Sequence, residues 1–288
     1  MNEKSLGQRL QAARQAAGMT QQQLCQTANL SFSTLTKIER GAIKSPSIFT
    51  VQSIAGALHL SLDELVGLTT PATNRNLQRT KSGVSFVYFD VNGCLIRFYE
   101  RAFARIAEQT NLTADVIETA FWHYNDDACR GTMSSHDFSL ALAARIGVTE
   151  LDWRQAYLEV TEPMAEMQEL LKWTAEHYKT GLLTNIMPGF MSGLRDQGKI
   201  PALPYDAIVD SSEIGAIKPE SKIFEVAQAR AAVPPNEILL IDDTRGNLNA
   251  AESFGWKVLW FDYARPEESV ALIRAALEPA IQAAPIIA

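Results

Sequence analysis

Five short apolar runs in the second part of the chain set narrow limits on its fold. They are rich in Val, Ile, Leu and Phe, are bounded by polar residues, and lie at 84–90, 180–185, 206–212, 237–243 and 257–262. Helical stretches separate the later runs, for example residues 221–231. Strands that alternate with helices are typical of a parallel sheet that is covered on both faces. We therefore predict a doubly wound, Rossmann-like α/β domain.

Residues 98–178 interrupt this alternation, because they carry no strand signal and their pattern indicates several amphipathic helices. An all-helical insertion after the first strand is a candidate cap over a site. The α/β domain is expected to span residues 84–276, with the cap at about 98–178 and a small, apolar tail at 277–288.

The first part of the chain has a different pattern and is predicted to be all helical. Ser5, Thr20 and Ser31 are placed to cap three helices, and Gln23 completes a capping box with Thr20. Two further helices are expected at residues 47–58 and 62–65. Residues 68–83 lie in a stretch with threonines, a proline and asparagines but no helical or alternating pattern, which indicates a linker. The helical domain is accordingly expected at residues 1–67.

Charge is divided unevenly between these two parts. The chain has 288 residues, a length that suggests about two domains, and a net charge of −7. This total argues against a nucleic-acid binder, whose charge is usually positive. However, residues 1–82 carry a net charge of +5 and the remainder a net charge of −12. Such asymmetry suggests that the two parts have different roles.

Cysteine content and hydropathy exclude several other classes of protein. The three cysteines are odd in number and widely spaced, which suits neither a disulfide framework nor a CxxC metal site. The amino-terminal residues contain no apolar segment typical of a signal peptide, and no apolar stretch approaches 18 residues. We therefore expect a cytoplasmic protein that does not enter a membrane.

The second and third predicted helices form a candidate helix-turn-helix. The recognition helix of such a motif enters the major groove, so its first turn must present small or hydrogen-bonding side chains. The motifs are T-x-x-x-L at 20–24, K-I-E-R-G at 37–41 and L-x-x-S-L-D-E-L at 58–65. With these motifs, residues 5–67 resemble the Cro/lambda-repressor-like (XRE) family. That resemblance implies sequence-specific DNA binding as a homodimer on a pseudo-palindromic operator, with contacts from Gln21, Phe32, Ser33, Thr34 and Lys37. A small helical bundle used for protein interaction is the alternative.

Polar side chains follow the predicted strands, where ligands bind in an open α/β sheet. Asp90 ends the first run, Thr184 and Asn185 end the second, and Asp242 and Asp243 end the fourth. Lys218 follows the third run. Carboxylates that converge repel one another unless a cation neutralises them, and carboxylate oxygens favour Mg²⁺. A nucleophilic aspartate with Mg²⁺ and a lysine makes phosphoryl transfer feasible.

Four ordered motifs carry these residues, namely FDVNGCL at 89–95, LLTN at 182–185, IGAIKPESKIF at 214–224 and ILLIDDTRGNLNAA at 238–251. They resemble the haloacid dehalogenase-like (HAD) hydrolase superfamily with a C1 cap. The sequence around residues 130–138 and 211–224 is most similar to the family's sugar-phosphate phosphatase-like and epoxide-hydrolase N-terminal branch. The resemblance implies Asp90 as nucleophile. It places Mg²⁺ on Asp90, Asn92, Asp242 and Asp243, and phosphate on Thr184, Asn185 and Lys218.

One residue departs from the pattern of the family's phosphatases, which have an aspartate as general acid/base where this chain has Asn92. An amide cannot transfer a proton, so we expect slower turnover, by about 10²–10⁴-fold. The catalytic set is then Asp90, Asn92, Thr184 and Lys218, weakened at Asn92.

The combined expectation is a DNA-binding transcriptional regulator fused to a Mg²⁺-dependent phosphatase-like domain. That domain either hydrolyses or senses a small phosphorylated metabolite. The alternative is a metabolic phosphatase whose helix-turn-helix serves oligomerisation or protein interaction.

Overall fold

The computed structural model describes residues 6–58, 62, 65, 77–97 and 99–279. Its contacts divide the chain into two compact units, residues 1–74 and 75–288, which we describe separately. The predicted cap at Ser5 and two of the four residues of the predicted helix at 62–65 lie outside the described residues. Among the described residues, no helix combines the length and apolarity needed to cross a membrane.

The first unit is helical, as predicted, with α1 (Leu6–Ala16), α2 (Gln21–Thr27), α3 (Phe32–Glu39) and α4 (Ile48–Ala57). The capping box of Thr20 and Gln23 at the start of α2 is confirmed. The Ser31 side chain accepts a hydrogen bond from the Thr34 N–H at the start of α3, as expected of an N-cap. A buried apolar core joins the helices and includes Leu10, Leu24, Leu35, Ile38, Val51 and Ile54.

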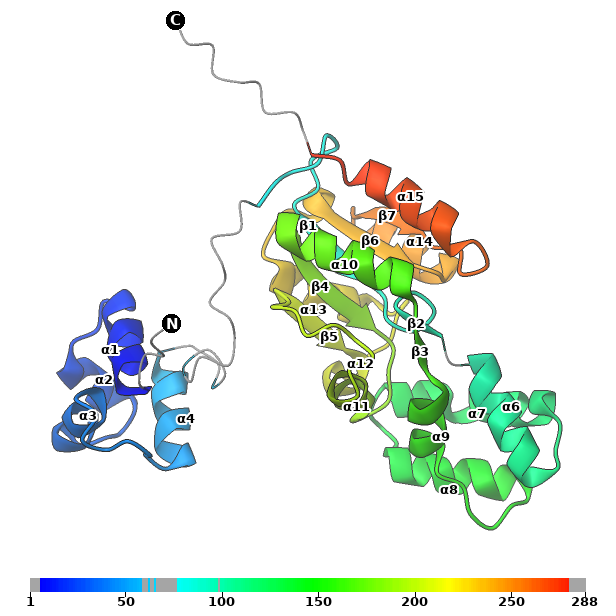
Figure 1. Cartoon of the computed structure of the whole chain (residues 1–288), viewed down its shortest axis with the longest axis horizontal. Coiled ribbons are helices and arrows are strands. Elements are labelled where there is room, and N and C mark those ends of the chain that lie inside the picture. The colour runs from blue at the N-terminus through cyan, green and yellow to red at the C-terminus, as the bar shows by residue number, and fades with distance from the viewer. Residues whose placement is uncertain (1–5, 59–61, 63–64, 66–76, 98, 280–288) are drawn as a thin grey trace, which may run out of the picture. The chain divides into compact units, whose positions relative to one another are not determined.

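A parallel five-stranded sheet forms the centre of the second unit, with the strand order β5-β4-β1-β6-β7 (Figure 1). The five predicted runs are confirmed as β1 (Phe86–Phe89), β4 (Lys179–Thr184), β5 (Ala207–Asp210), β6 (Ile238–Asp242) and β7 (Lys257–Trp260). All four residues of β1 are buried, because helices cover both faces of the sheet. After β1 the chain adds β4 and β5 on one side of it and then crosses over to add β6 and β7 on the other side. β1 therefore lies at the switch point where such folds bind ligands.

Alternate residues of β1 enter two separate cores. Phe86 and Tyr88 pack with apolar residues of α13 (Ser221–Ala231) and α14 (Arg245–Ser253). Val87 and Phe89 belong to the core that includes α10 (Ala165–His177) and α15 (Pro266–Ala276), which lie along one face of the sheet in Figure 1. Three short helical segments connect the strands, namely α11 (Phe190–Asp196), α12 (Ser211–Ile214) and the 3-10 turn η1 (Pro235–Glu237).

The helical insertion is smaller than the expected range of 98–178. Its helices are α6 (Tyr99–Thr110), α7 (Ala114–Cys129), α8 (Ser135–Ile146) and α9 (Trp153–Val160). A two-stranded antiparallel ribbon, β2 (Ile96–Arg97) with β3 (Glu162–Pro163), joins the insertion to the sheet, and the sequence carried no signal for it. The last predicted helix of the range is α10, which packs on β4 and α15 and flanks the sheet instead.

Part of the stretch expected as a linker is hydrogen-bonded to the second unit. The Gln78 N–H donates to the His177 carbonyl, and Thr80 forms an isolated bridge with Pro279. Arg79 forms an ion pair with Glu237 at 2.6 Å. The chain therefore joins the second unit before β1 begins.

Candidate functional site

Asp90 stands at the carboxyl end of the central strand β1 and is buried. Thr184 and Asp242 are the last residues of the two neighbouring strands, β4 and β6, and are also buried. Parallel pairing of these strands brings the three residues to one edge of the sheet. The strand-end cluster expected from the sequence is therefore assembled by the sheet.

Lys218 lies between two of these carboxylates. Its Nζ atom is 2.8 Å from Asp90 Oδ1 and 2.6 Å from Asp242 Oδ2, with 1% of the side chain exposed. Burial lowers the pKa of Lys218, but the carboxylates of Asp242 and Asp90 raise it above its ordinary value. The lysine is thus a fixed cation beside the candidate nucleophile.

Asp242 accepts hydrogen bonds from several donors. Besides Lys218, its oxygens accept hydrogen bonds from Asn247 Nδ2, at 3.0 and 3.1 Å, and from the Thr244 N–H, at 2.8 Å. These donors occupy both carboxylate oxygens. Asp242 therefore holds Lys218 in place, and its neighbour Asp243 lies close to Asp90.

A ligand atom each of Asp90, Asp243 and Cys94 lies within 4.8 Å of the others. Burial, followed by the charge of Asp242, raises the pKa of Asp243 to about 6. Burial also raises the pKa of Asp90, against the opposing effect of Lys218. One lysine does not neutralise three neighbouring carboxylates, and a hard cation between Asp90 and Asp243 would relieve the repulsion.

The donor set fits Mg²⁺ through oxygen and not through sulfur. Burial raises the pKa of the Cys94 thiol well above its ordinary value, so the side chain is a protonated, packed thiol. Gly93, at φ +90°, leaves room for this arrangement, since a Cβ atom there would lie 2.1 Å from Asp243 Oδ2. The loop after β1 therefore needs glycine at this position.

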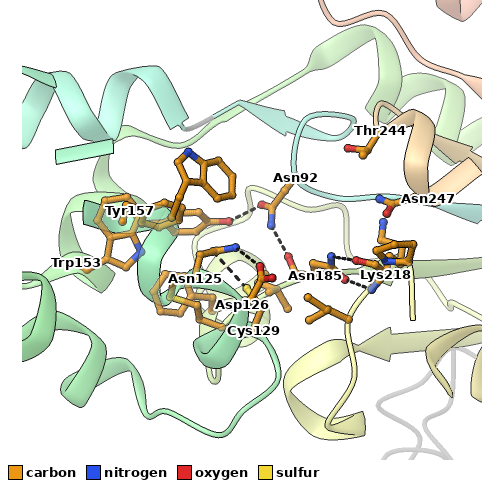
Figure 2. A pocket seen from close by; sticks show the side chains of 17 residues that line it. Asn92, Asn125, Asp126, Cys129, Trp153, Tyr157, Asn185, Lys218, Thr244 and Asn247 are labelled. Carbon is orange, nitrogen blue, oxygen red and sulfur yellow. Dashed lines mark hydrogen bonds between the residues drawn. The ribbon is translucent and has the colours of Figure 1, made fainter. Parts of the chain in front are cut away.

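The Asn92 side chain connects the helical insertion with the sheet (Figure 2). Its Nδ2 donates to the Asn185 carbonyl at 2.8 Å, and its Oδ1 accepts from the Tyr157 hydroxyl at 2.9 Å. Tyr157 belongs to α9 of the insertion and is buried. The amide of Asn92 thus uses both of its ends in fixed hydrogen bonds, an arrangement that the sequence did not predict.

The other two residues expected at a phosphate have distinct positions. The Asn185 amide donates to the Lys218 carbonyl at 2.9 Å and accepts from the Lys218 N–H at 2.7 Å. Asn185 lines the cavity and holds the loop that carries Lys218. Thr184 is fully buried, and its hydroxyl makes a weak contact of 3.4 Å with the Asn185 carbonyl.

A cavity of about 360 Å³ opens between the sheet and the insertion (Figure 2). Its lining includes Asn92, Lys218 and Asn247 on the sheet side. On the other side it includes residues of α7 and α9 that the sequence analysis did not select, namely Phe121, Trp122, Asn125, Asp126, Cys129, Trp153 and Tyr157. Residues 121, 125 and 129 recur at helical spacing on α7, but only the tertiary structure tells which face of that helix meets the sheet.

Among the residues expected to contact DNA, Gln21 lies in the first turn of α2, Phe32, Ser33 and Thr34 lie in the first turn of α3, and Lys37 lies in its last turn. Phe32, Ser33 and Lys37 are exposed, with 51% of Phe32 accessible. Thr34 is half-buried and its hydroxyl lies 2.8 Å from that of Ser31, within the helix cap. α3 therefore presents polar side chains and one large ring to solvent.

Gln21 is part of a buried ion-pair cluster. Its Nε2 donates to Glu39 Oε2 at 2.7 Å, and Arg14 donates to both oxygens of Glu39, at 2.8 and 3.0 Å. Burial raises the pKa of Glu39, but hydrogen bonds from Arg14 and Gln21 outweigh it and hold the pKa below its ordinary value. The cluster ties α1, α2 and α3 together.

Comparison with known proteins assigns both parts of the chain. Residues 85–255 match the family model of haloacid dehalogenase-like hydrolases, and residues 10–65 match a helix-turn-helix family. An HAD family enzyme from Bacteroides thetaiotaomicron, solved as a mutant in complex with magnesium and inorganic phosphate, superposes with a TM-score of 0.53 at 22% identity. The match covers 63% of this chain and 95% of that one, and it shows the shared fold.

Two curated relatives match separate parts of the chain. The immunity repressor protein of Bacillus phage phi105 is 42% identical over 66 residues, covering 23% of this chain and 45% of the repressor. The pyrimidine 5'-nucleotidase YjjG of Escherichia coli is 26% identical over 149 residues, covering 46% of this chain and 63% of the nucleotidase. The chain thus spans less than two thirds of the length of each of these relatives. A helix-turn-helix region is fused to a hydrolase-type domain.

Proposed function

Because the chain belongs to the haloacid dehalogenase-like hydrolase family, we propose that its second unit hydrolyses a small phosphate monoester, and that its first unit binds an operator as a homodimer. The observation that carries the first part is the position of Lys218. Lys218 lines the cavity, its Nζ bridges Asp90 and Asp242, and Asp243 lies beside Asp90. This arrangement sets a carboxylate, a fixed cation and a metal site around one point.

In the proposed reaction, a carboxylate oxygen of Asp90 attacks phosphorus and the bond to the leaving-group oxygen breaks. The products of this step are an aspartyl-phosphate and an alkoxide, which takes its proton from solvent water because Asn92 has none to transfer. Water then attacks the aspartyl-phosphate, which releases inorganic phosphate and restores the Asp90 carboxylate. Lys218 donates to the transferring oxygens, and Asn185 keeps it in place through the two bonds of its amide. Mg²⁺ held by Asp90 and Asp243 supplies positive charge to the phosphoryl oxygens when it is bound.

Asn92 makes this proposed enzyme slow, because its amide carries no proton that it can transfer to the leaving group. Tyr157 and the Asn185 carbonyl hold the amide in the mouth of the site. This observation favours a second candidate function, in which the domain binds the phosphorylated metabolite as a sensor. In both versions, the hydrogen bond from Tyr157 to Asn92 links ligand binding at the site to the helical insertion.

A phosphatase screen with Mg²⁺ separates the two versions. The wild-type protein is compared with Asp90→Asn, which removes the nucleophile, and with Asn92→Asp, which restores an acid. Turnover that Asp90→Asn abolishes supports the enzyme. Equal background rates in the wild-type and Asp90→Asn proteins would rule out hydrolysis, and binding of inorganic phosphate would then support the sensor.

The DNA-binding part of the proposal rests on the exposed side chains of α3, with Ser33 in its first turn and Lys37 in its last turn. A gel-shift screen against genomic fragments at several salt concentrations tests it. Lys37→Ala should weaken binding and reduce the salt slope by about 1, since it removes one phosphate contact. The control is Lys172→Ala, an exposed lysine of the hydrolase domain. If no fragment shifts, the result favours the alternative, in which the helix-turn-helix serves oligomerisation or protein interaction.

A further inference from the structure

We infer that the cavity selects a phosphate monoester whose leaving group is a single flat, apolar and uncharged ring system. This inference rests on the proposed function and names the substrate class of the same site. It is carried by the size of the cavity, by the charges on its lining and by the aromatic side chains that meet there.

Size limits the ligand to a monomeric metabolite. A volume of about 360 Å³ is near the lower end of the range for small-molecule pockets. It equals the liquid volume of about a dozen water molecules. One phosphate group and one ring system fill such a space, whereas an oligonucleotide or a phosphorylated protein segment does not.

Charge limits the ligand to one anionic group. Among the lining residues Lys218 is the single cation, and it lies at the sheet end next to Asp90. The formally charged residue that lines the other end is Asp126, on α7. A carboxylate or second phosphate on the leaving group would meet Asp126, whose partner Arg130, 3.9 Å away, is already shared with Asp127 and Glu220.

Two arginines that the sequence placed near the insertion do not change this balance. Arg130 forms an ion pair with Glu220 at 2.7 Å and does not line the cavity. Arg97 donates to the Tyr263 carbonyl at 3.0 Å and is likewise outside the lining. Neither one lines the cavity as a partner for a second anion.

Aromatic side chains form much of the wall opposite the sheet. Phe121 and Trp153 have ring centroids 4.7 Å apart, and Tyr157 and Phe190 have theirs 4.8 Å apart. Trp122 lines the cavity beside them and is 47% exposed, so it stands at the solvent side of the wall. The paired rings are buried and make the wall apolar, while the exposed ring of Trp122 can stack on a flat apolar ligand, since aromatic pairs gain energy beyond the area that they bury. A polyol leaving group needs many hydrogen-bond partners, and three of the four asparagines that line the cavity, Asn92, Asn185 and Asn247, already bond within the protein.

Binding is measured by calorimetry with the full-length Asp90→Asn protein and Mg²⁺, so that turnover is not required. The probes are inorganic phosphate, glycerol phosphate, phenyl phosphate and 4-carboxyphenyl phosphate. Phenyl phosphate should bind about tenfold more tightly than glycerol phosphate, and the added carboxylate should cost about tenfold.

Two acidic neighbours on α7 provide a matched pair of variants. Asp126 and Asp127 are equally exposed, and each lies within 4.0 Å of the Arg130 guanidinium, but only Asp126 lines the cavity. With Asp126→Lys, 4-carboxyphenyl phosphate should bind at least as tightly as phenyl phosphate. With Asp127→Lys, the preference for phenyl phosphate should stay as in the parent protein.

A second pair tests the ring wall. Trp122→Ala should weaken phenyl phosphate about three- to tenfold and leave inorganic phosphate unchanged. Val116→Ala, an exposed residue on the same helix that does not line the cavity, should change neither.

The inference is overturned if glycerol phosphate or the carboxylated probe binds as tightly as phenyl phosphate, or if Asp126→Lys and Asp127→Lys behave alike. In those cases inorganic phosphate still binds, and the proposed function stands. If inorganic phosphate and all three esters fail to bind, the phosphate site itself is absent and both proposals fall.

Discussion

Replacing Lys218 with methionine should destabilise the hydrolase domain strongly while keeping the length of the side chain. The substitution removes the cation that lies 2.8 Å from Asp90 and 2.6 Å from Asp242. Asp242 keeps the donors of Asn247 and Thr244, and Asp90 keeps a bond of 2.7 Å from the Val91 N–H. Breaking a buried ion pair by removing one partner costs about 3–5 kcal/mol, and we expect a value in this range.

The assay is urea unfolding in EDTA, followed by tryptophan fluorescence. All five tryptophans lie between residues 122 and 260, so the signal reports on the hydrolase domain of the full chain. With a urea dependence of about 2 kcal/mol per molar, a loss of about 4 kcal/mol lowers the midpoint by about 2 M. Lys222→Met is the matched control, because Lys222 is exposed on α13 and its loss should change stability by less than about 0.5 kcal/mol.

A double variant tests whether the loss of stability comes from the uncompensated carboxylates. Adding Asp242→Asn to Lys218→Met removes one of the two carboxylates that lost their cation. The pair should therefore be less destabilised than the sum of the single variants, because residues in contact are not additive. A loss below about 1 kcal/mol for Lys218→Met, or simple additivity in the double variant, would refute the view that Lys218 compensates these carboxylates.

Four further predictions follow from the same structure. Asn92→Asp should raise the rate of phosphate-ester hydrolysis by about 10²–10⁴-fold, measured as kcat with Mg²⁺, and an unchanged rate would show that proton transfer is not what limits turnover. Because the pKa of Glu39 is lowered in the folded state, its stabilising contribution is present above its unfolded pKa of about 4.3 and lost as pH falls through the folded value. Circular dichroism should accordingly show that Arg14→Met costs more stability at pH 7 than at pH 3, and a cost independent of pH would count against the ion pair. Gly93→Ala should abolish activity and stabilisation by Mg²⁺, since its Cβ would collide with Asp243, and retained Mg²⁺ stabilisation would contradict the loop geometry. Mg²⁺ at 100 times its Kd should stabilise the wild-type hydrolase domain by about 2.7 kcal/mol in the urea assay, and Asp243→Ala should lose that effect.

The sequence determined the elements because their signals are local. The five apolar runs, the capping box at Thr20 and the caps of α2 and α3 depend on residues a few positions apart. The ordered motifs also identified both families. Asp90, Lys218 and Asp242 could be selected in advance, because polar residues after parallel strands gather at one edge of the sheet.

The separate roles of these strand-end residues could be assigned only from the tertiary structure. Asp242 and Asp243 are adjacent in the chain, and nothing local tells which one faces Lys218 and which faces Asp90. The backbone turn after β6 decides it, by pointing the Thr244 N–H and Asn247 at Asp242. The bond between Tyr157 and Asn92 joins residues 65 positions apart, so neither sequence neighbourhood contains its partner.

The extent of the insertion and the nature of the cavity were likewise decided by packing. α10 has the same kind of amphipathic pattern as the helices before it, but its apolar face covers the sheet, while α7 and α9 turn aromatic side chains toward the strand ends. Helical periodicity predicts which side chains share a face, but it does not predict which segment that face packs against. The sequence therefore determined which groups this protein has for chemistry, and the tertiary structure decided which of them meet, since contacts between distant segments follow from how whole faces are buried.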